Sequence, residues 1–197
     1  VYVSNRGKAA IFAVIGGDRL SDGANIAVSH VDSPRIDIKQ NPIYEDSELC
    51  YLKTHYYGGI KKYQWFSIPL ELRGVISLKN GKTIEIKEIG SPVFVINDLL
   101  PHLGQEQMKK PLSDEFSGES LNALVGSEPL KDDDGGDVVL LNVLNILHQK
   151  YSIVEEDFLS AELSLVPAFH ALDVGFDKSM IGAYGQDDRV CAYPSLV

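Results

Sequence analysis

Two short stretches of the sequence hold side chains of the types that can bind metals. His30 and Asp32 stand two residues apart in AVSHVDSPRID, where an apolar run ends at Ser33 and Pro34. Alternation along an extended chain puts both side chains on one side, so the carboxylate can accept the second imidazole N–H and fix the tautomer that binds a metal. A hydrogen-bonded turn accounts for the same residues, and the pattern alone leaves both interpretations open.

The second stretch, MIGAYGQDDRVCAY, places Asp187 and Asp188 directly before a predicted helix, RVCAYPSL. Helix capping explains one carboxylate, because side-chain oxygens accept the free amide N–H groups at a helix start. Two adjacent carboxylates allow one to cap the helix while the other points into a cleft. There it could bridge two metal ions.

Buried strands are the elements expected to position the histidine. KAAIFAVIGG and GANIAVSH are short apolar runs bounded by glycines and polar turns, which is typical of strands covered on both faces in an α/β sheet. We therefore expect His30 at the carboxyl end of a buried strand, where open α/β sheets place ligands and catalytic groups.

From about residue 44 the pattern changes to that of a separate α+β module. SIPLELRGVISLKNGKTIEIKEI alternates around Asn80 and Gly81 and predicts a tight hairpin, and DFLSAELSLVPAF predicts a further strand. NDLLPHLGQEQMKK predicts a loop and a short helix capped by Asp98. VVLLNVLNILHQKY predicts a helix with one apolar face, formed by Leu140, Leu141, Leu144, Leu147 and Tyr151.

The acidic stretch KDDDGGD is the other candidate for metal binding. It lacks the glycine at the sixth position and the glutamate at the twelfth that a calcium-binding loop requires, so it predicts a solvated turn.

Composition excludes several classes of function. The 197 residues carry a formal net charge of -10, with no stripe of Lys and Arg among aromatics, which disfavours nucleic acid as a partner. The apolar runs are far shorter than the roughly 20 residues of a membrane-spanning helix. Two widely spaced cysteines, Cys50 and Cys191, fit a reducing, cytoplasmic location. The sequence opens at Val1 directly in strand-like residues, so we expect a part of a longer protein.

Four blocks together resemble the aspartyl aminopeptidase family of zinc metallopeptidases in its bacterial form. They are SHVDSPRIDIKQNP, THYYGGIKKYQWFSIPL, DLLPHLGQEQMKK and SMIGAYGQDDRVCAYPSL, and they occur in the family's order across nearly the whole chain. The resemblance implies an α/β fold class: a zinc-exopeptidase-like sheet domain, present in part, with an inserted α+β dimerisation domain. Residues 1–43 and 177–197 would belong to the metal-binding peptidase domain, and residues 44–176 to the inserted domain.

The resemblance also implies roles for single residues. His30 would bind one zinc ion, Asp32 would be the catalytic residue that supports it, and Asp187 would bridge two zinc ions, with Asp188 as the alternative. The family's other ligands and its general-base glutamate are expected beyond the end of this chain. His102, in LLPHL, would contact substrate in the active site of a neighbouring subunit.

The activity implied is that of a zinc-dependent aminopeptidase with two ions per subunit, which removes N-terminal, acidic residues from peptides through a metal-activated water. Partners would be peptide substrates and further copies, as dimers assembling to a dodecamer, with neither nucleic acid nor membrane. Candidates for a cationic specificity pocket are Lys61, Lys62, Lys109 and Lys110. Two alternatives stay open: a catalytically silent assembly or scaffold module, and a two-metal hydrolase of other specificity.

Overall fold

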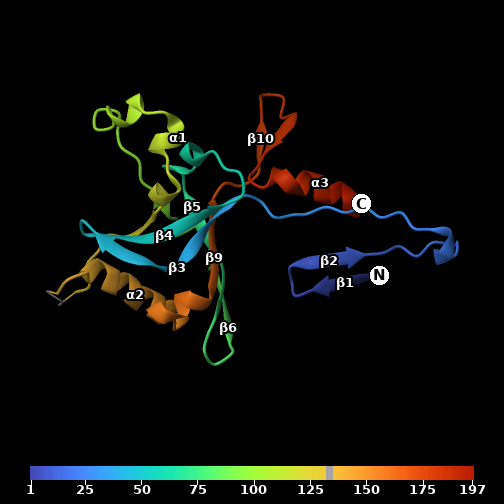
Figure 1. Ribbon diagram of the computed structural model, residues 1–197, viewed down its shortest axis with the longest axis horizontal. Helices are drawn as coiled ribbons and strands as arrows, with labels where there is room; N and C mark the ends of the chain where they lie inside the picture. Colours follow the sequence, from blue (N-terminus) through green and yellow to red (C-terminus); the bar gives the residue numbers. More distant parts are fainter. Residues whose placement is uncertain (132–134) are drawn as a thin grey trace. The chain divides into compact units, whose positions relative to one another are not determined.

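The computed structural model describes residues 1–131 and 135–197 (Figure 1). The chain divides into two units. The smaller unit comprises Val1–Ser33 with Tyr184–Val197, and the larger comprises Pro34–Ala183. Helices and strands both contribute, which confirms the predicted mixed α/β class. The acidic stretch predicted to be a solvated turn includes residues 132–134, which lie outside the described residues.

The larger unit is built on a seven-stranded sheet in the order β6-β5-β9-β3-β4-β8-β7, with every paired strand antiparallel. Leu70 on β5 and Phe94, just before β7, exchange two backbone hydrogen bonds of 2.8 Å. This bridge joins opposite ends of the strand order, so the sheet curls back on itself. The strands are β3 (Arg35–Asp46), β4 (Leu49–Tyr57), β5 (Leu70–Ser77), β6 (Thr83–Glu88), β7 (Val95–Ile96), β8 (Ala123–Gly126) and β9 (Ala161–Pro167).

The hairpin predicted around Asn80 and Gly81 is confirmed as the connection from β5 to β6. Gly81 has φ +82°, which glycine adopts without steric cost, and the Asn80 side chain accepts the N–H of Lys82. Gly74, inside β5, has φ +145°, and a Cβ there would lie 2.0 Å from the carbonyl oxygen of Glu162 on β9. A glycine at this position therefore lets the two strands pair.

Helix α2 (Val138–Tyr151) covers strands β3 and β4, and its existence is confirmed. Its buried residues are Val139 and Val143, which pack against Ile43, Cys50 and Leu52. Three predicted face residues, Leu140, Leu144 and Leu147, are only partly buried, and Leu141 is exposed. The prediction misplaced the centre of the face because the two valines, four residues apart, share one side of the helix and sit closest to the sheet.

The segment after β7 differs from the predicted loop and capped helix. Asp98 accepts hydrogen bonds from the N–H of Leu99 and the side chain of Gln107, so it ties the loop together and caps no helix. A single 3-10 turn (Gln107–Lys109) and the short α1 (Leu112–Glu115) follow. His102 lies exposed in this loop.

The remaining elements of the larger unit are short. Strands β10 (Leu172–Val174) and β11 (Met180–Gly182) form an antiparallel hairpin. Further 3-10 helices are Lys62–Trp65, Gly118–Ser120 and Glu155–Ser160. In the part of the chain that the structure describes, no helix is both long and apolar enough to cross a membrane.

The smaller unit holds a hairpin of β1 (Tyr2–Asn5) and β2 (Ala9–Phe12), a 3-10 turn (Leu20–Asp22) and α3 (Gln186–Leu196). The predicted helix after the two aspartates is thus confirmed. The predicted buried strand over residues 24–30 is wrong, since this stretch is exposed and in no strand. An apolar run becomes a strand only when a neighbour pairs with its backbone, and in the described residues the sheet of this unit has β1 and β2 alone.

Candidate metal centre

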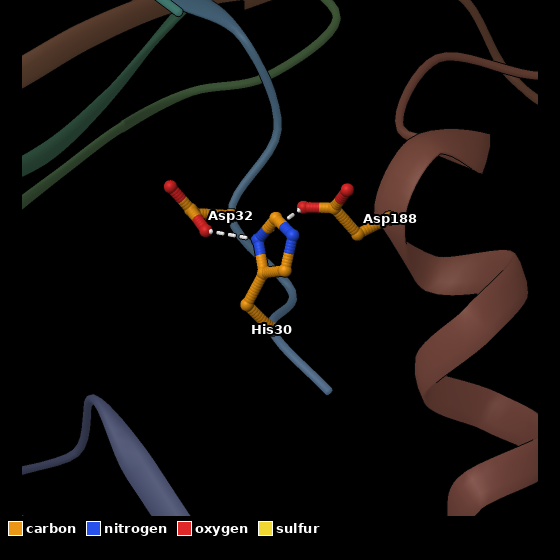
Figure 2. A group of neighbouring side chains, drawn as sticks. All are labelled: His30, Asp32 and Asp188. Carbon is orange, nitrogen blue, oxygen red and sulfur yellow. Dashed lines mark hydrogen bonds and ion pairs between the residues drawn. The ribbon is translucent and has the colours of Figure 1, made fainter. Parts of the chain in front are cut away.

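Three side chains of the smaller unit converge on one point: His30, Asp32 and Asp188 (Figure 2). Nδ1 of His30 lies 2.9 Å from Oδ1 of Asp32 and 2.7 Å from Oδ2 of Asp188. One possible ligand atom from each residue falls within 4.8 Å of the others. His30 and Asp32 come from an extended segment and Asp188 from the first turn of α3, so the chain brings together residues that are far apart in sequence.

Of the two adjacent aspartates, the structure brings the side chain of Asp188 to His30. Asp187 has φ −85° and ψ 110°, which is not helical, and its peptide bond to Asp188 is cis. The carboxylate that contacts the imidazole is that of Asp188, while the carbonyl oxygen of Asp187 accepts a hydrogen bond from Oγ of Ser33 at 3.0 Å. The two aspartates are thus held on different partners.

Negative charge dominates the electrostatics of the cluster. The hydrogen bond that His30 donates to Asp32, together with the charges of Asp188 and Asp187, raises the pKa of His30. Hydrogen bonding with Asp187, burial and the neighbouring carboxylates raise the pKa of Asp188, although His30 acts in the opposite direction. The pKa values of His30 and Asp188 are raised for the same reason. Carboxylates that lie close together favour a bound positive charge, whether a proton or a metal cation.

The donor set fits zinc. Zinc in proteins takes imidazole nitrogen and carboxylate oxygen, usually in a four-coordinate shell. Nδ1 carries at most one hydrogen and so donates to one carboxylate at a time. With Asp32 as its acceptor, His30 presents Nε2 to a metal, and the carboxylates of Asp187 and Asp188 are at hand to join it.

The structure thus brings together His30 and Asp32, with Asp188 in contact and Asp187 beside it. His102 belongs to the larger unit and is exposed. Ser33 was assigned no role from the sequence, although its hydroxyl bonds the aspartate segment. The sequence feature that could have indicated this role is the position of Ser33, a polar residue directly after the His-x-Asp pattern.

Comparison with known proteins gives a family. The chain matches the family described as "Aminopeptidase I zinc metalloprotease (M18)" over residues 1–197. A probable M18 family aminopeptidase 1 of Clostridium acetobutylicum is 52% identical over 199 residues, which are 100% of this chain and 43% of that protein. The crystal structure of an M18 aminopeptidase from Thermotoga maritima matches with a TM-score of 0.90 at 52% identity, over 98% of this chain and 42% of that one.

Two more distant proteins also match. An aspartyl aminopeptidase of Caenorhabditis elegans is 25% identical over 211 residues, covering 98% of this chain and 44% of that protein. The structure of a Saccharomyces cerevisiae mApe1 dodecamer matches with a TM-score of 0.56 at 19% identity, over 84% of this chain and 36% of that one, and shows the fold alone. The chain spans less than half the length of these relatives. By a match over its whole length, it belongs to the M18 family of zinc metalloprotease aminopeptidases.

Proposed function

We propose that the protein of which this chain is a part is a zinc-dependent aminopeptidase that removes acidic N-terminal residues from peptides. The observation that carries the proposal is the convergence of His30, Asp32 and Asp188 within a chain that matches the M18 family throughout. The printed name of the Caenorhabditis elegans relative supports the acidic preference.

The residues of the cluster take distinct parts. His30 binds one of two zinc ions through Nε2, and Asp32 holds Nδ1–H and so fixes the tautomer and the direction of the ring. The chemistry supplied at this site, when zinc is bound, would be activation of a water near neutral pH and polarisation of the scissile carbonyl. The free N-terminal amine of the substrate binds beside this centre, which makes the activity that of an exopeptidase.

Asp187 is proposed as the carboxylate that bridges the two ions. The family motif favours it, whereas the contact between Asp188 and His30 is the argument for Asp188. Asp187 is exposed, and its contact with Ser33 is made by the backbone carbonyl, so this contact does not occupy the carboxylate.

Residues 44–176 are proposed as an inserted dimerisation domain, and His102 as the residue that reaches substrate in a neighbouring subunit. Dimers would assemble to a dodecamer in the cytoplasm, an arrangement that the dodecameric yeast relative supports. Mixing an inactive His102→Ala subunit with an inactive Asp187→Ala subunit tests whether His102 acts in the active site of a neighbouring subunit. Partial recovery of activity supports action across the subunit boundary, and no recovery in verified mixed oligomers rejects it.

A substrate panel with the full-length protein tests the activity itself. Peptides that differ only in an N-terminal Asp, Glu, Leu or Ala should be cleaved fastest when that residue is acidic, and a chelator should abolish cleavage until zinc is restored. Cleavage of Leu and Ala peptides alone would indicate a two-metal hydrolase of other specificity. Zinc-loaded protein that cleaves none of them would indicate an assembly module.

Lys61, Lys62, Lys109 and Lys110 remain the candidates for recognition of the acidic side chain. Lys110 is paired with Glu115, at 2.9 Å, and Lys109 with Glu106, so these two ammonium groups are already partly neutralised. The nitrogen of Lys62 lies 5.5 Å from the ring centroid of Tyr56. Each lysine is replaced by Met, and kcat/KM is measured on peptides with N-terminal Asp or Leu. Loss of a lysine that recognises the acidic side chain should lower kcat/KM for the Asp peptide and leave that for the Leu peptide unchanged.

A further inference from the structure

Ser33 links the two segments that carry the metal-binding side chains. It follows Asp32 directly, and its hydroxyl donates to the carbonyl oxygen of Asp187 at 3.0 Å across 154 residues of sequence. Ser33 is only 8% exposed, whereas the side chains of His30 and Asp32 are 75% and 46% exposed. Ser33 is therefore buried although the two candidate ligands that precede it in the chain are exposed.

We propose that Ser33 is a positioning residue that holds the His30–Asp32 segment against the Asp187–Asp188 segment and thereby sets the affinity for zinc. This inference rests on the proposed function, since it assumes that the cluster binds metal. Ser33 itself touches neither metal nor substrate in this proposal and acts only through the backbone of Asp187.

Repulsion between carboxylates makes such a link necessary. Asp32 and Asp188 both have a carboxylate oxygen within 2.9 Å of Nδ1 of His30, and Asp187 is the direct neighbour of Asp188, so three carboxylates share one small region. In the metal-free protein like charges push the two segments apart. A hydrogen bond between two uncharged groups, a hydroxyl and a carbonyl, opposes this separation without adding charge and keeps the ligands close before the cation arrives.

The local backbone supplies little other restraint. Residues 24–34 lie in no strand, so no ladder of backbone hydrogen bonds fixes the direction of His30. On the other side, Asp187 departs from helical geometry at the start of α3. A tertiary bond between these two irregular segments therefore has more influence on ligand spacing than the same bond between two regular elements.

Gly185 explains why position 33 suits a small hydroxyl residue. Gly185 has φ +83°, and a Cβ there would lie 3.2 Å from Oγ of Ser33 and 2.3 Å from Nη1 of Arg189. The hydroxyl thus fits closely against the glycine at the N-terminal end of α3. A larger side chain at either position would press the two segments apart.

Ser195→Ala provides a matched control for Ser33→Ala. Ser195 also lies in the smaller unit, and its hydroxyl also donates to a backbone carbonyl at 3.0 Å, that of Cys191. It is exposed and joins two residues of the same helix, so its removal deletes the same chemical bond without touching the link between the segments.

The experiment measures zinc affinity of the full-length protein by competition with a chromophoric chelator. We expect Ser33→Ala to bind zinc about 10-fold more weakly or worse, as losses of supporting hydrogen bonds behind metal ligands do, and Ser195→Ala to match the parent. The visible absorption of the Co²⁺-loaded protein should change in Ser33→Ala alone, because the coordination geometry changes.

Three outcomes would overturn the inference: parental zinc affinity in Ser33→Ala, an equal loss in Ser195→Ala, or loss of the metal-free fold of Ser33→Ala by circular dichroism, which would mean a purely structural role. Failure of the proposed function has a different signature, because it would appear in the parent protein itself, as absence of zinc binding or absence of cleavage of acidic peptides.

Discussion

Glu45 on β3 caps helix α2, because its Oε2 accepts the backbone N–H of Val139, 94 residues later in the chain, at 2.9 Å. The same oxygen also accepts the N–H of Leu140 at 2.8 Å. The first N–H groups of a helix have no partner within the helix, and a negative charge there also interacts favourably with the helix dipole. One carboxylate thus serves the capping of α2 and its attachment to the sheet.

Removing this cap should destabilise the larger unit. Glu45→Ala is expected to lower the free energy of unfolding by about 1 kcal/mol, the usual cost of a lost N-terminal cap. Urea denaturation followed through Trp65, the chain's only tryptophan and a buried residue of this unit, measures the change. Glu85→Ala is the control, since Glu85 makes an exposed pair with Lys87 on β6. Equal losses in both variants would contradict a capping role.

Glu71 should make the stability of the larger unit depend on acid pH. Burial acts to raise the pKa of this carboxyl, but hydrogen bonds from Arg73 and the N–H of Gly90, with the charge of His170, hold it below its ordinary value. A lowered folded-state pKa contributes stability that is complete above the unfolded value of about 4.3 and disappears as pH falls through the folded value.

Glu71→Gln tests this dependence because the amide does not titrate. The stability difference between parent and variant should be constant near neutral pH and shrink below about pH 4. Urea denaturation at a series of pH values measures it. A stability difference that stays constant down to pH 2 would show that the titration of Glu71 does not contribute to the pH dependence of stability.

Gly74→Ala should disrupt the pairing of β5 with β9. Its Cβ would lie 2.0 Å from a backbone oxygen of Glu162, and φ +145° is unfavourable for alanine, so the strands must move apart. We expect a loss of about 2 to 3 kcal/mol in the free energy of unfolding, as for overpacked interiors. Gly59→Ala meets no atom within 4 Å and should cost little. Similar stability of the two variants would argue against the close approach.

Asp32→Asn should weaken metal binding without removing a ligand. The amide keeps the shape but accepts the imidazole N–H less strongly, so zinc affinity is expected to fall about 10- to 100-fold. Equilibrium dialysis of the full-length protein measures it. Asp22→Asn, an exposed change in the same unit, is the control. If Asp32→Asn keeps parental zinc affinity and activity, the contact between His30 and Asp32 is only a hydrogen-bonded turn at the end of the apolar run.

Zinc content distinguishes the two neighbouring aspartates. If Asp187 bridges the ions, Asp187→Asn should lose at least one zinc per subunit, because a bridging carboxylate serves both sites. Asp188→Asn should retain both ions with reduced affinity, since it alters only the surroundings of His30. Elemental analysis of purified full-length variants gives the counts, and the reverse pattern would assign the bridge to Asp188.

Local patterns predicted the elements whose stabilising contacts are local. The turn at Asn80 and Gly81 carries its own backbone preference, and α2 carries its own periodicity. Which face of α2 is buried depends on how closely it approaches β3 and β4, and so the valines replaced the predicted leucines at its centre. The stretch 24–30 failed as a strand because pairing depends on residues elsewhere in the chain.

The same limit applies to the site. The spacing of His30 and Asp32 suffices to predict their contact, because two residues along an extended chain face one side. The spacing of Asp187 and Asp188 does not, since the contact of His30 with Asp188 follows from a non-helical backbone at Asp187 that no residue pattern specifies. The hydrogen bond from the hydroxyl of Ser33 to the carbonyl of Asp187 joins residues 154 positions apart, so it depends on the tertiary fold and not on a local pattern.

The position of β9 also determines when the sheet can form during synthesis. β9 lies between β3 and β5, so the edges of these two strands that face β9 stay unpaired until Ala161–Pro167 has left the ribosome. At about 5 to 20 residues per second, the edges of β3 and β5 wait on the order of ten seconds for this partner. Unpaired edges of this kind recruit strands from other chains. Nascent copies on neighbouring ribosomes are therefore at greatest risk of aggregation before β9 emerges, and a chaperone that shields β3 would act in that interval.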